Sequence, residues 1–455
     1  MAKATKRNPW AWIPSLYFAQ GIPFIFINMV TMVLFTQLGM SETDATLYTG
    51  WLYLPWVIKP FWGPIVDIIR TKRWWTVTMQ ICVAVGLAAI AFTLPLPNKE
   101  EIANGLPVNA FMLCLFFYFI TAFCSATHDI ASDGFYMLAL NTSEQSMFVG
   151  IRSTFYRCAN VFGQGGLVIL AGILQSQTGD VALGWKYTVI ICAVFFAVVS
   201  IYHTFILPTP TADKAVGGED AKKKSIGDIL KEFSGSFVTF FQKKHVILAM
   251  LFMLLYRLPE AQVVKLCQPF LLASRDAGGL GMTQTEVGFA YGTLAIIGLT
   301  IGGIIGGIVA SKGGLKKWIW PMALATSLNC VAYIILSNVQ PSYAEIGGKA
   351  IIFSAIVLEQ FAYGFGFTAF MLYMMYFADG PYKTSHYAIC TAFMALGMML
   401  PGMAAGYIKE SLLGNSYIMF FWWVLACNFA TWTVTALVRK HIDPKYGAKQ
   451  VEEKK

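Results

Sequence analysis

Twelve long apolar segments follow one another along this chain of 455 residues, and short loops separate most of them. An α-helix of about 20 apolar residues crosses the hydrocarbon core of a bilayer, so these segments constrain the fold more than any other feature of the sequence. The strands of a membrane barrel would instead read as short runs of alternating polarity. We therefore predict an all-α membrane protein with twelve transmembrane helices in the lipid bilayer.

The composition agrees with a lipid environment and excludes several other classes of protein. Hydrophobic residues make up 57% of the chain and charged residues only 13%, with a mean hydropathy of +0.60, which leaves too little polar surface for a soluble globule. The net charge of +9 does not indicate a nucleic-acid partner, because the basic residues cluster at helix ends. The nine cysteines fall mostly within apolar segments and form no CxxC pair, so we interpret them as small core residues rather than metal ligands.

The predicted spans divide into two halves of six, with a longer polar segment between them. We place them at 12–38, 46–66, 74–94, 110–138, 148–174 and 185–207, and at 246–272, 287–310, 318–336, 350–377, 385–407 and 417–438. The predicted domains are an N-terminal six-helix bundle (1–207), a cytoplasmic linker (208–244) and a C-terminal six-helix bundle (245–455). Apolar residues recur at helical spacing over 226–241, which predicts an amphipathic helix on the membrane surface.

Basic residues are distributed unequally between the two sides of the predicted bundle. Twelve spans place both termini on one side, and that side holds most of the lysines and arginines, among them Lys3, Arg7, Arg70, Arg73, Lys222, Lys243, Lys316 and Arg439. Because cytoplasmic loops carry an excess of Lys and Arg, we expect both termini in the cytoplasm.

The loop after the second span carries a motif of glycine, aspartate and basic residues. It reads Gly63-Pro-Ile-Val-Asp67-Ile-Ile-Arg70-Thr-Lys-Arg73. The Asp is suited to a helix end and the basic run to the cytoplasmic surface potential. The motif resembles the loop motif of the major facilitator superfamily, which also has two halves of six helices. By this resemblance Gly63, Asp67, Arg70 and Arg73 are candidate gating residues.

Ionisable side chains inside the spans carry the functional information, because each costs roughly 2.5–3.5 kcal/mol on insertion scales and needs a cavity or a partner. In the second span Lys59 either snorkels to the interface or faces a binding cavity. In the fourth span Asp129 and Asp133 are spaced i,i+4, and two carboxylates on one helix face cannot both ionise cheaply. One of them is a candidate proton carrier, unless Asp133 simply pairs with Arg152 or Arg157.

The seventh and tenth spans carry further charges. Arg257 and Glu260 flank Pro259, and a helix broken by proline at that depth is typical of a binding site, although the pair could instead lock the helix internally. In the tenth span Glu359 and Gln360 stand in an otherwise apolar helix, so the carboxylate needs a partner from elsewhere.

Other polar and aromatic residues leave the choice of function open. His128 and His386 fit either proton relays or hydrogen-bonded packing residues, and Tyr256 and Trp51 are candidates for stacking on sugar rings. We find no nucleophile with its base and no cluster of metal ligands, so we expect neither an enzyme nor a cofactor. The expected energy source is a proton gradient. A receptor would normally append a signalling domain, and no segment reads as one.

Four segments combine into a more specific pattern. They are Leu54-Pro55 with Lys59-Pro-Phe-Trp-Gly-Pro-Ile-Val-Asp67, Ala126-Thr-x-Asp129-Ile-x-x-Asp133, Tyr256-Arg257-Leu-x-Glu260 followed by Gln268-Pro-Phe-Leu, and Glu359-Gln-Phe-x-x-Gly364-x-Gly366 with Thr384-x-x-Tyr387-Ala. Together they resemble the AmpG-type muropeptide permeases and their acetyl-coenzyme A transporter relatives, over nearly the whole chain. The chain departs from that family pattern at His128, where Gln is usual, at Gly134, and at Arg257 with Glu260, which replace the common Lys and Asp.

This resemblance implies proton-driven import, by alternating access across a bacterial inner membrane, of N-acetylglucosaminyl-anhydro-N-acetylmuramyl sugars with or without peptide, for cell-wall recycling. The family pattern implies that substrate and protons bind at Lys59, Asp129, Asp133, Arg257 and Glu260. Further candidates for substrate binding are Arg152, Tyr256, Glu359 and Gln360, since carboxylates need counter-charges and sugars suit aromatic faces. Acetyl-coenzyme A or another anionic metabolite is the alternative substrate, and we expect a monomer.

Overall fold

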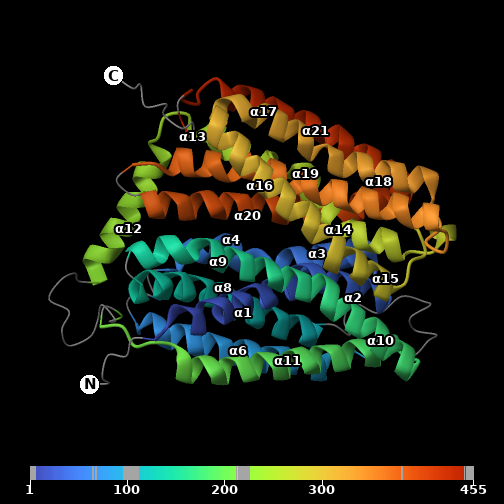
Figure 1. The fold of residues 1–455 in the computed structure, drawn as a ribbon, viewed down its shortest axis with the longest axis horizontal. Helices are drawn as coiled ribbons and strands as arrows, with labels where there is room; N and C mark the ends of the chain where they lie inside the picture. Colours follow the sequence, from blue (N-terminus) through green and yellow to red (C-terminus); the bar gives the residue numbers. More distant parts are fainter. Residues whose placement is uncertain are drawn as a thin grey trace. The chain divides into compact units, whose positions relative to one another are not determined.

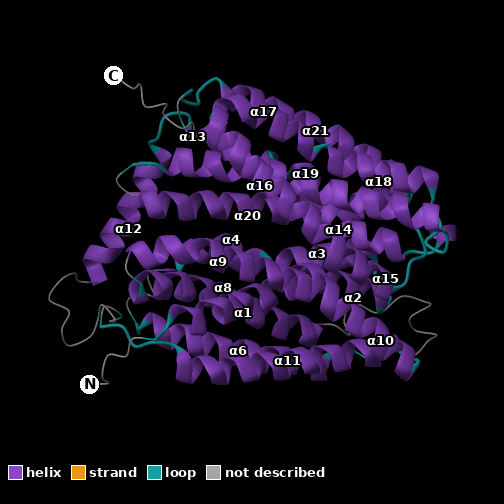
Figure 2. Ribbon diagram, in the orientation of Figure 1, coloured by secondary structure: helices purple, strands orange, loops and turns teal. Residues whose placement is uncertain are grey.

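The structure, a computed structural model, describes residues 7–63, 66, 69–95, 112–140, 142–211, 213, 226–380, 383–444 and 446. These residues form helices and connecting loops, with no β-strand among them (Figure 1 and Figure 2). Eleven helices within these ranges are long and apolar enough to cross a membrane. Because a helix satisfies its own backbone hydrogen bonds in lipid, the chain is a multi-pass membrane protein.

The observed helices confirm the all-α membrane fold, and eleven of the predicted spans correspond to them. These helices are Pro9–Gln37, Lys72–Thr93, Met112–Ala139, Thr154–Thr178, Val181–Ile206, Val246–Leu272, Gln284–Ala310, Leu315–Val339, Ile346–Ala378, His386–Leu412 and Tyr417–Arg439. The helix predicted within the linker is also present as α12 (Ile226–Phe241).

The second predicted span, at 46–66, differs because it is not one continuous helix. It consists of α3 (Glu42–Trp51), α4 (Leu54–Ile58) and the short 3-10 helix η3 (Lys59–Phe61). Pro55 and Pro60 stand in the first turns of α4 and η3, and neither can donate a backbone hydrogen bond to the turn before it. The prolines therefore account for the breaks, and Lys59 lies at the second of them.

The chain divides into two compact units, one formed by Met1–Ser41 with Trp51–Gly235 and the other by Glu42–Gly50 with Ser236–Lys455. The first unit contains α1 (Ile13–Ile25), α6 (Lys72–Thr93), α8 (Met112–Ala139), α9 (Thr142–Asn160), α10 (Val168–Thr178) and α11 (Val181–Ile206). Helix α6 packs between α8 and α11, and α1 packs on α8 and α9. Trp12, Tyr17 and Phe135 belong to the core of this unit.

The second unit is built around α19 (Ile346–Ala378). The other helices of this unit are α13 (Val246–Leu255), α14 (Leu258–Leu272), α15 (Gln284–Phe289), α16 (Ala295–Gly313), α17 (Leu315–Thr326), α18 (Leu328–Val339), α20 (Lys383–Tyr407) and α21 (Tyr417–Arg439). Helix α16 packs tightly along α19, because a Cβ at Gly302 would overlap the backbone of Phe361 and one at Gly364 that of Leu299.

Pro259 breaks the seventh span, as predicted, into α13 and α14. Pro259 has no N–H to donate to the carbonyl of Leu255, and the hydroxyl of Thr431 on α21 donates to that carbonyl instead, at 3.0 Å. The break is therefore satisfied by a side chain of a neighbouring helix, which is how irregular backbone persists at membrane depth.

Candidate functional site

Asp129, on α8, is a buried carboxyl within a membrane-spanning helix of the first unit. Asp129 is only 8% exposed, and the indole Nε1 of Trp56 on α4 donates a hydrogen bond to its Oδ2 at 3.1 Å. The other oxygen, Oδ1, accepts no hydrogen bond from a described residue. A buried carboxylate with a single neutral donor is costly, so this environment favours a neutral, protonated carboxyl or the approach of a cation.

Two side chains from other helices complete the surroundings of Asp129. Lys59 on η3 attracts the carboxylate electrostatically, and the amide of Gln20 on α1 lies beside it. Gln20 is itself buried, and its Oε1 has no donor among the described residues. A protonated Asp129 would therefore bring a hydroxyl donor into a pocket that has acceptors in excess.

Asp133, one turn along α8, lies in a different environment. Its Oδ1 accepts from Arg152 at 3.0 Å and from the hydroxyl of Tyr17 at 3.1 Å. The Arg152 guanidinium also stacks over Tyr17 and Tyr136, at 4.5 and 5.0 Å from the ring centroids. The structure thus shows the pairing that the sequence left as an alternative for Asp133, and this pair occupies Arg152.

His128 belongs to a buried chain of hydrogen bonds. Its Nε2 lies 2.9 Å from Nε2 of Gln80 on α6 and 3.1 Å from the hydroxyl of Ser132. The Gln80 oxygen faces Nδ1 of His203 on α11 at 2.9 Å, and Nε2 of His203 faces Ser15 on α1, also at 2.9 Å. Since the amide and the hydroxyl both donate to Nε2 of His128, this ring is a neutral acceptor that joins four helices. The geometry supports the packing interpretation.

We expect His128→Leu to lower the apparent melting temperature of the detergent-solubilised protein, because the Gln80 amide loses its acceptor in a buried site. The destabilisation should be about 1 kcal/mol, the usual size for such bonds inside membrane proteins. His128→Gln supplies an amide oxygen and should retain most of the stability. The fraction of monodisperse protein after heating measures this effect, and identical curves for all three proteins would show that the network contributes nothing.

Arg257 and Glu260 form the charged pair of the second unit. The guanidinium Nε donates to Oε2 at 2.9 Å and its NH2 donates to Oε1, so the contact is bidentate. Arg257 lies at the break between α13 and α14, and its guanidinium also faces the rings of Phe367 and Tyr363 on α19, at 4.9 and 5.6 Å. The side chains are 9% and 13% exposed, so the pair is desolvated but reachable.

Tyr256 requires a correction. It is 1% exposed, its hydroxyl donates to the carbonyl of Gly366 at 2.9 Å, and its ring stacks on Phe370 at 5.3 Å. A ring covered in this way holds α13 against α19 and has no free face for a sugar. Trp51, the other stacking candidate, is 49% exposed and keeps an accessible ring.

Glu359 is a buried carboxyl of the second unit, on α19. It is 6% exposed, and the Nε2 of Gln360 donates to its two oxygens at 3.0 and 2.9 Å. The hydrogen-bond partner seen among the described residues is therefore the adjacent amide on the same helix, whereas the sequence analysis expected a partner from elsewhere. No described basic group forms an ion pair with Glu359.

The four candidate gating residues differ in their surroundings. Arg73 donates to the carbonyls of Leu207 at 3.2 Å and Thr204 at 2.5 Å, which ties the start of α6 to the end of α11. Arg70 is exposed and stacks over Trp74 at 5.7 Å. A Cβ on Gly63 would meet no atom within 4 Å, and Asp67 lies outside the described residues.

Lys265 on α14 is a buried cation that the sequence did not single out. It is 5% exposed, and its ammonium donates to the hydroxyl oxygen of Thr49 on α3 at 3.0 Å. The Thr49 hydroxyl in turn donates to the carbonyl of Ala45 at 2.7 Å. The sequence does show a lysine inside an apolar span. It cannot show that this lysine contacts Thr49, which is more than 200 positions away in the chain.

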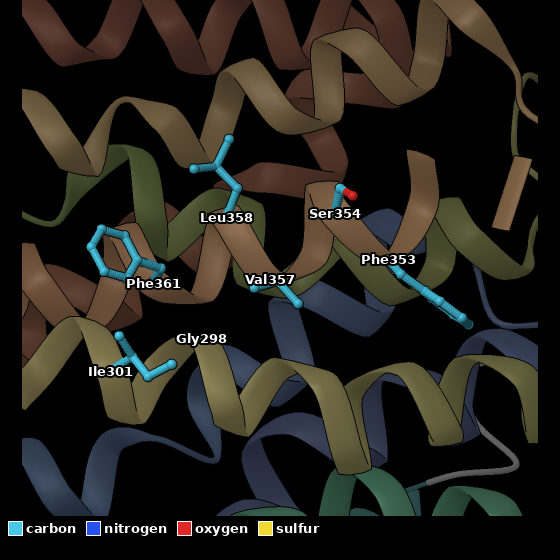
Figure 3. A pocket seen from close by; sticks show the side chains of 7 residues that line it. All are labelled: Gly298, Ile301, Phe353, Ser354, Val357, Leu358 and Phe361. Carbon is cyan, nitrogen blue, oxygen red and sulfur yellow. The ribbon is translucent and has the colours of Figure 1, made fainter. Parts of the chain in front are cut away.

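A groove of about 420 Å³ runs beside the α16–α19 contact (Figure 3). Its lining is apolar apart from the hydroxyl of Ser354, and includes Ile301, Phe353, Leu358 and Phe361. A charged sugar needs convergent polar groups, which this lining does not provide. The groove is therefore suited to hydrocarbon, and we do not assign it to a solute.

Comparisons with known proteins agree on the fold and point to one group of relatives. A family model described as Major Facilitator Superfamily matches residues 15–403. An anhydromuropeptide permease of Escherichia coli strain K12 is 24% identical over 414 residues, covering 89% of this chain and 75% of that protein. A protein of Rickettsia conorii whose name includes AmpG is 24% identical over 411 residues, covering 88% and 90%. The solved structure of a D-xylose-proton symporter matches with a TM-score of 0.68 at 14% identity, covering 96% of this chain and 98% of that one.

Proposed function

The chain belongs to the major facilitator superfamily, and we propose that this transporter imports anhydromuropeptides together with protons. The proposed substrates are N-acetylglucosaminyl-anhydro-N-acetylmuramyl sugars with or without peptide, taken up for cell-wall recycling. The similarity to the Escherichia coli anhydromuropeptide permease supports this substrate class. Such molecules carry carboxylates and sugar rings, so they require cationic and aromatic groups in one place.

The observation that carries the substrate proposal is the position of Arg257. Its guanidinium lies at a helix break, between a carboxylate partner and two aromatic rings of α19. A substrate carboxylate can replace Glu260 as the bidentate partner, so that the guanidinium is never left without an anion. The ring of Phe367 then offers a face to the sugar.

The proton proposal is carried by Asp129. The carboxyl has neutral donors and acceptors around it, and Lys59 supplies attraction only when the carboxyl is ionised. Uptake of a proton therefore changes how strongly α4 and η3 are held to α8. Since both segments begin at proline breaks, we propose that this part of the chain moves during alternating access.

The site of action and assembly follow from the same proposal. We propose a monomer in a bacterial inner membrane with both termini in the cytoplasm. The excess of Lys and Arg on the side of the termini supports this orientation.

Uptake by purified protein in proteoliposomes tests the function. With the lumen alkaline relative to the bath, we expect saturable accumulation of labelled N-acetylglucosaminyl-anhydro-N-acetylmuramic acid, about ten-fold per pH unit for one coupled proton. A protonophore should abolish the accumulation, and unlabelled acetyl-coenzyme A should not compete. Empty liposomes are the control.

Two outcomes would overturn the proposal. If the protein takes up acetyl-coenzyme A but no sugar, the substrate class is wrong. If sugar uptake is saturable but indifferent to the pH gradient and the protonophore, the protein is a facilitator without proton coupling.

A further inference from the structure

Four carboxyls on the predicted membrane-spanning helices fall into two kinds. Asp133 and Glu260 are held in ion pairs with Arg152 and Arg257. In the observed structure each of these two carboxylates therefore has a cationic partner. Among the described residues, Asp129 and Glu359 instead accept hydrogen bonds from neutral groups, the Trp56 indole and the Gln360 amide.

Within the part of the chain that the structure describes, no basic side chain forms an ion pair with Glu359. The titratable groups that interact with it are Glu260 and Cys267 on α14, Tyr291 on η7 (Ala290–Leu294), and Cys330 and Tyr333 on α18. The two tyrosine hydroxyls are hydrogen-bonded to each other, and Glu260 is already neutralised by Arg257. An ionised Glu359 is therefore stabilised by little besides one amide, and a proton removes the cost of a buried charge.

The Gln360 amide can serve both states of the carboxyl. Its N–H groups donate to the carboxylate oxygens in the observed arrangement. After a 180° rotation of the amide, its oxygen can accept from a protonated Glu359. Asp129 has a comparable arrangement, because the Gln20 amide lies beside it. The two carboxyls also stand on the fourth helix of each half of the chain, α8 and α19.

We propose that Glu359 is a proton-carrying carboxyl of the second unit, in place of the substrate contact first predicted for it. The proposal rests on proton coupling as the function. A proton from water forms the O–H bond of Glu359 on one side of the membrane, and that bond breaks to return the proton to water on the other. The proton must leave Glu359 before the empty transporter returns to its starting conformation, because the second unit makes this return only with the carboxyl ionised.

Glu359→Gln tests this step, because glutamine has the same shape and stays neutral. In proteoliposomes we expect gradient-driven uptake to fall at least about ten-fold, which corresponds to a barrier raised by about 1.4 kcal/mol. Counterflow exchange, which needs no return of the empty transporter, should stay close to the wild-type rate. Glu345→Gln, an exposed glutamate just before the same helix, is the matched control and should behave as the wild type.

A readout without transport separates this inference from the proposed function. Infrared difference spectra between acidic and alkaline buffer should show a protonated carboxyl band in the wild-type protein that is lost in Glu359→Gln and retained in Glu345→Gln. If the wild type shows no driven uptake, the proposed function fails while the spectra still decide the role of Glu359. An unchanged band, or driven uptake at the wild-type rate in Glu359→Gln, overturns the inference. If the variant loses exchange as well, the spectra alone decide.

Discussion

Proteoliposomes that contain Asp129→Asn should lose gradient-driven uptake and retain counterflow exchange. The asparagine keeps the shape of the side chain and can still accept from the Trp56 indole, which lies 3.1 Å from the carboxylate in the wild type. It cannot bind or release a proton, so the empty transporter has no way to reset. We expect driven uptake to fall by at least about ten-fold, with the rate of exchange nearly unchanged.

Asp133→Asn is the informative comparison for this experiment. Asp133 is only four residues away on the same helix, but its carboxylate is paired with Arg152. Replacing it should weaken the contact between α8 and α9 and lower stability, while the remaining protein stays coupled to the gradient. Wild-type accumulation by Asp129→Asn, or uncoupling by Asp133→Asn alone, would move the proton site one turn along α8 and refute our assignment.

Hydrophobicity predicted the membrane helices well because lipid leaves the backbone few alternatives. The seventh span was expected at 246–272, and the helix runs Val246–Leu272. The second span is not a single helix because Pro55 and Pro60 interrupt it. Both prolines are visible in the sequence, but a prediction from hydrophobicity alone does not take them into account. The helix break at Pro259 was predicted correctly, because this proline lies between the charged residues Arg257 and Glu260.

The candidate site was predictable only as far as charge is visible in a sequence. Charged residues in apolar helices identified Asp129, Arg257 and Glu359, but the neutral partners of Asp129 come from distant segments of the chain. Trp56 and Gln20 carry no charge, so nothing in the sequence separates them from other core residues. Tyr256 lies beside the charged pair, and for this reason the sequence suggested that its ring binds the substrate. Only the structure shows that the ring is buried.

Each unit contains one carboxyl in an ion pair and one that accepts hydrogen bonds from a neutral group, so the two units have the same combination. The ion pair of Asp133 with Arg152 joins α8 to α9. We assign proton uptake to Asp129, which accepts from the Trp56 indole of α4, and to Glu359, which accepts from the adjacent Gln360 amide on the same helix. On our proposal, protonation therefore acts on neutral hydrogen-bonding partners rather than on the basic residues that we assign to the substrate.

Arg257→Gln should abolish detectable uptake and exchange alike, because it removes the cation that we assign to the substrate carboxylate. Loss of one member of a buried, hydrogen-bonded charge pair costs about 2–5 kcal/mol. For substrate binding this corresponds to a rise of at least about thirty-fold in the KM for uptake. The variant also leaves Glu260 without the partner that holds both of its oxygens, so reduced folding yield is expected.

The double variant Arg257→Gln/Glu260→Gln separates binding from folding. Two amides can hydrogen-bond to each other, and neither leaves an unpaired charge, so the thermal stability lost in Arg257→Gln should largely return. If the ion pair only locked α14 at its break, transport would return with stability. We expect instead that the double variant folds, melts close to the wild type and still fails to bind labelled anhydromuropeptide, because the guanidinium that recognises the carboxylate is missing. Restored uptake in this variant would reduce Arg257 to a structural residue and leave Lys59 as the cation to test next.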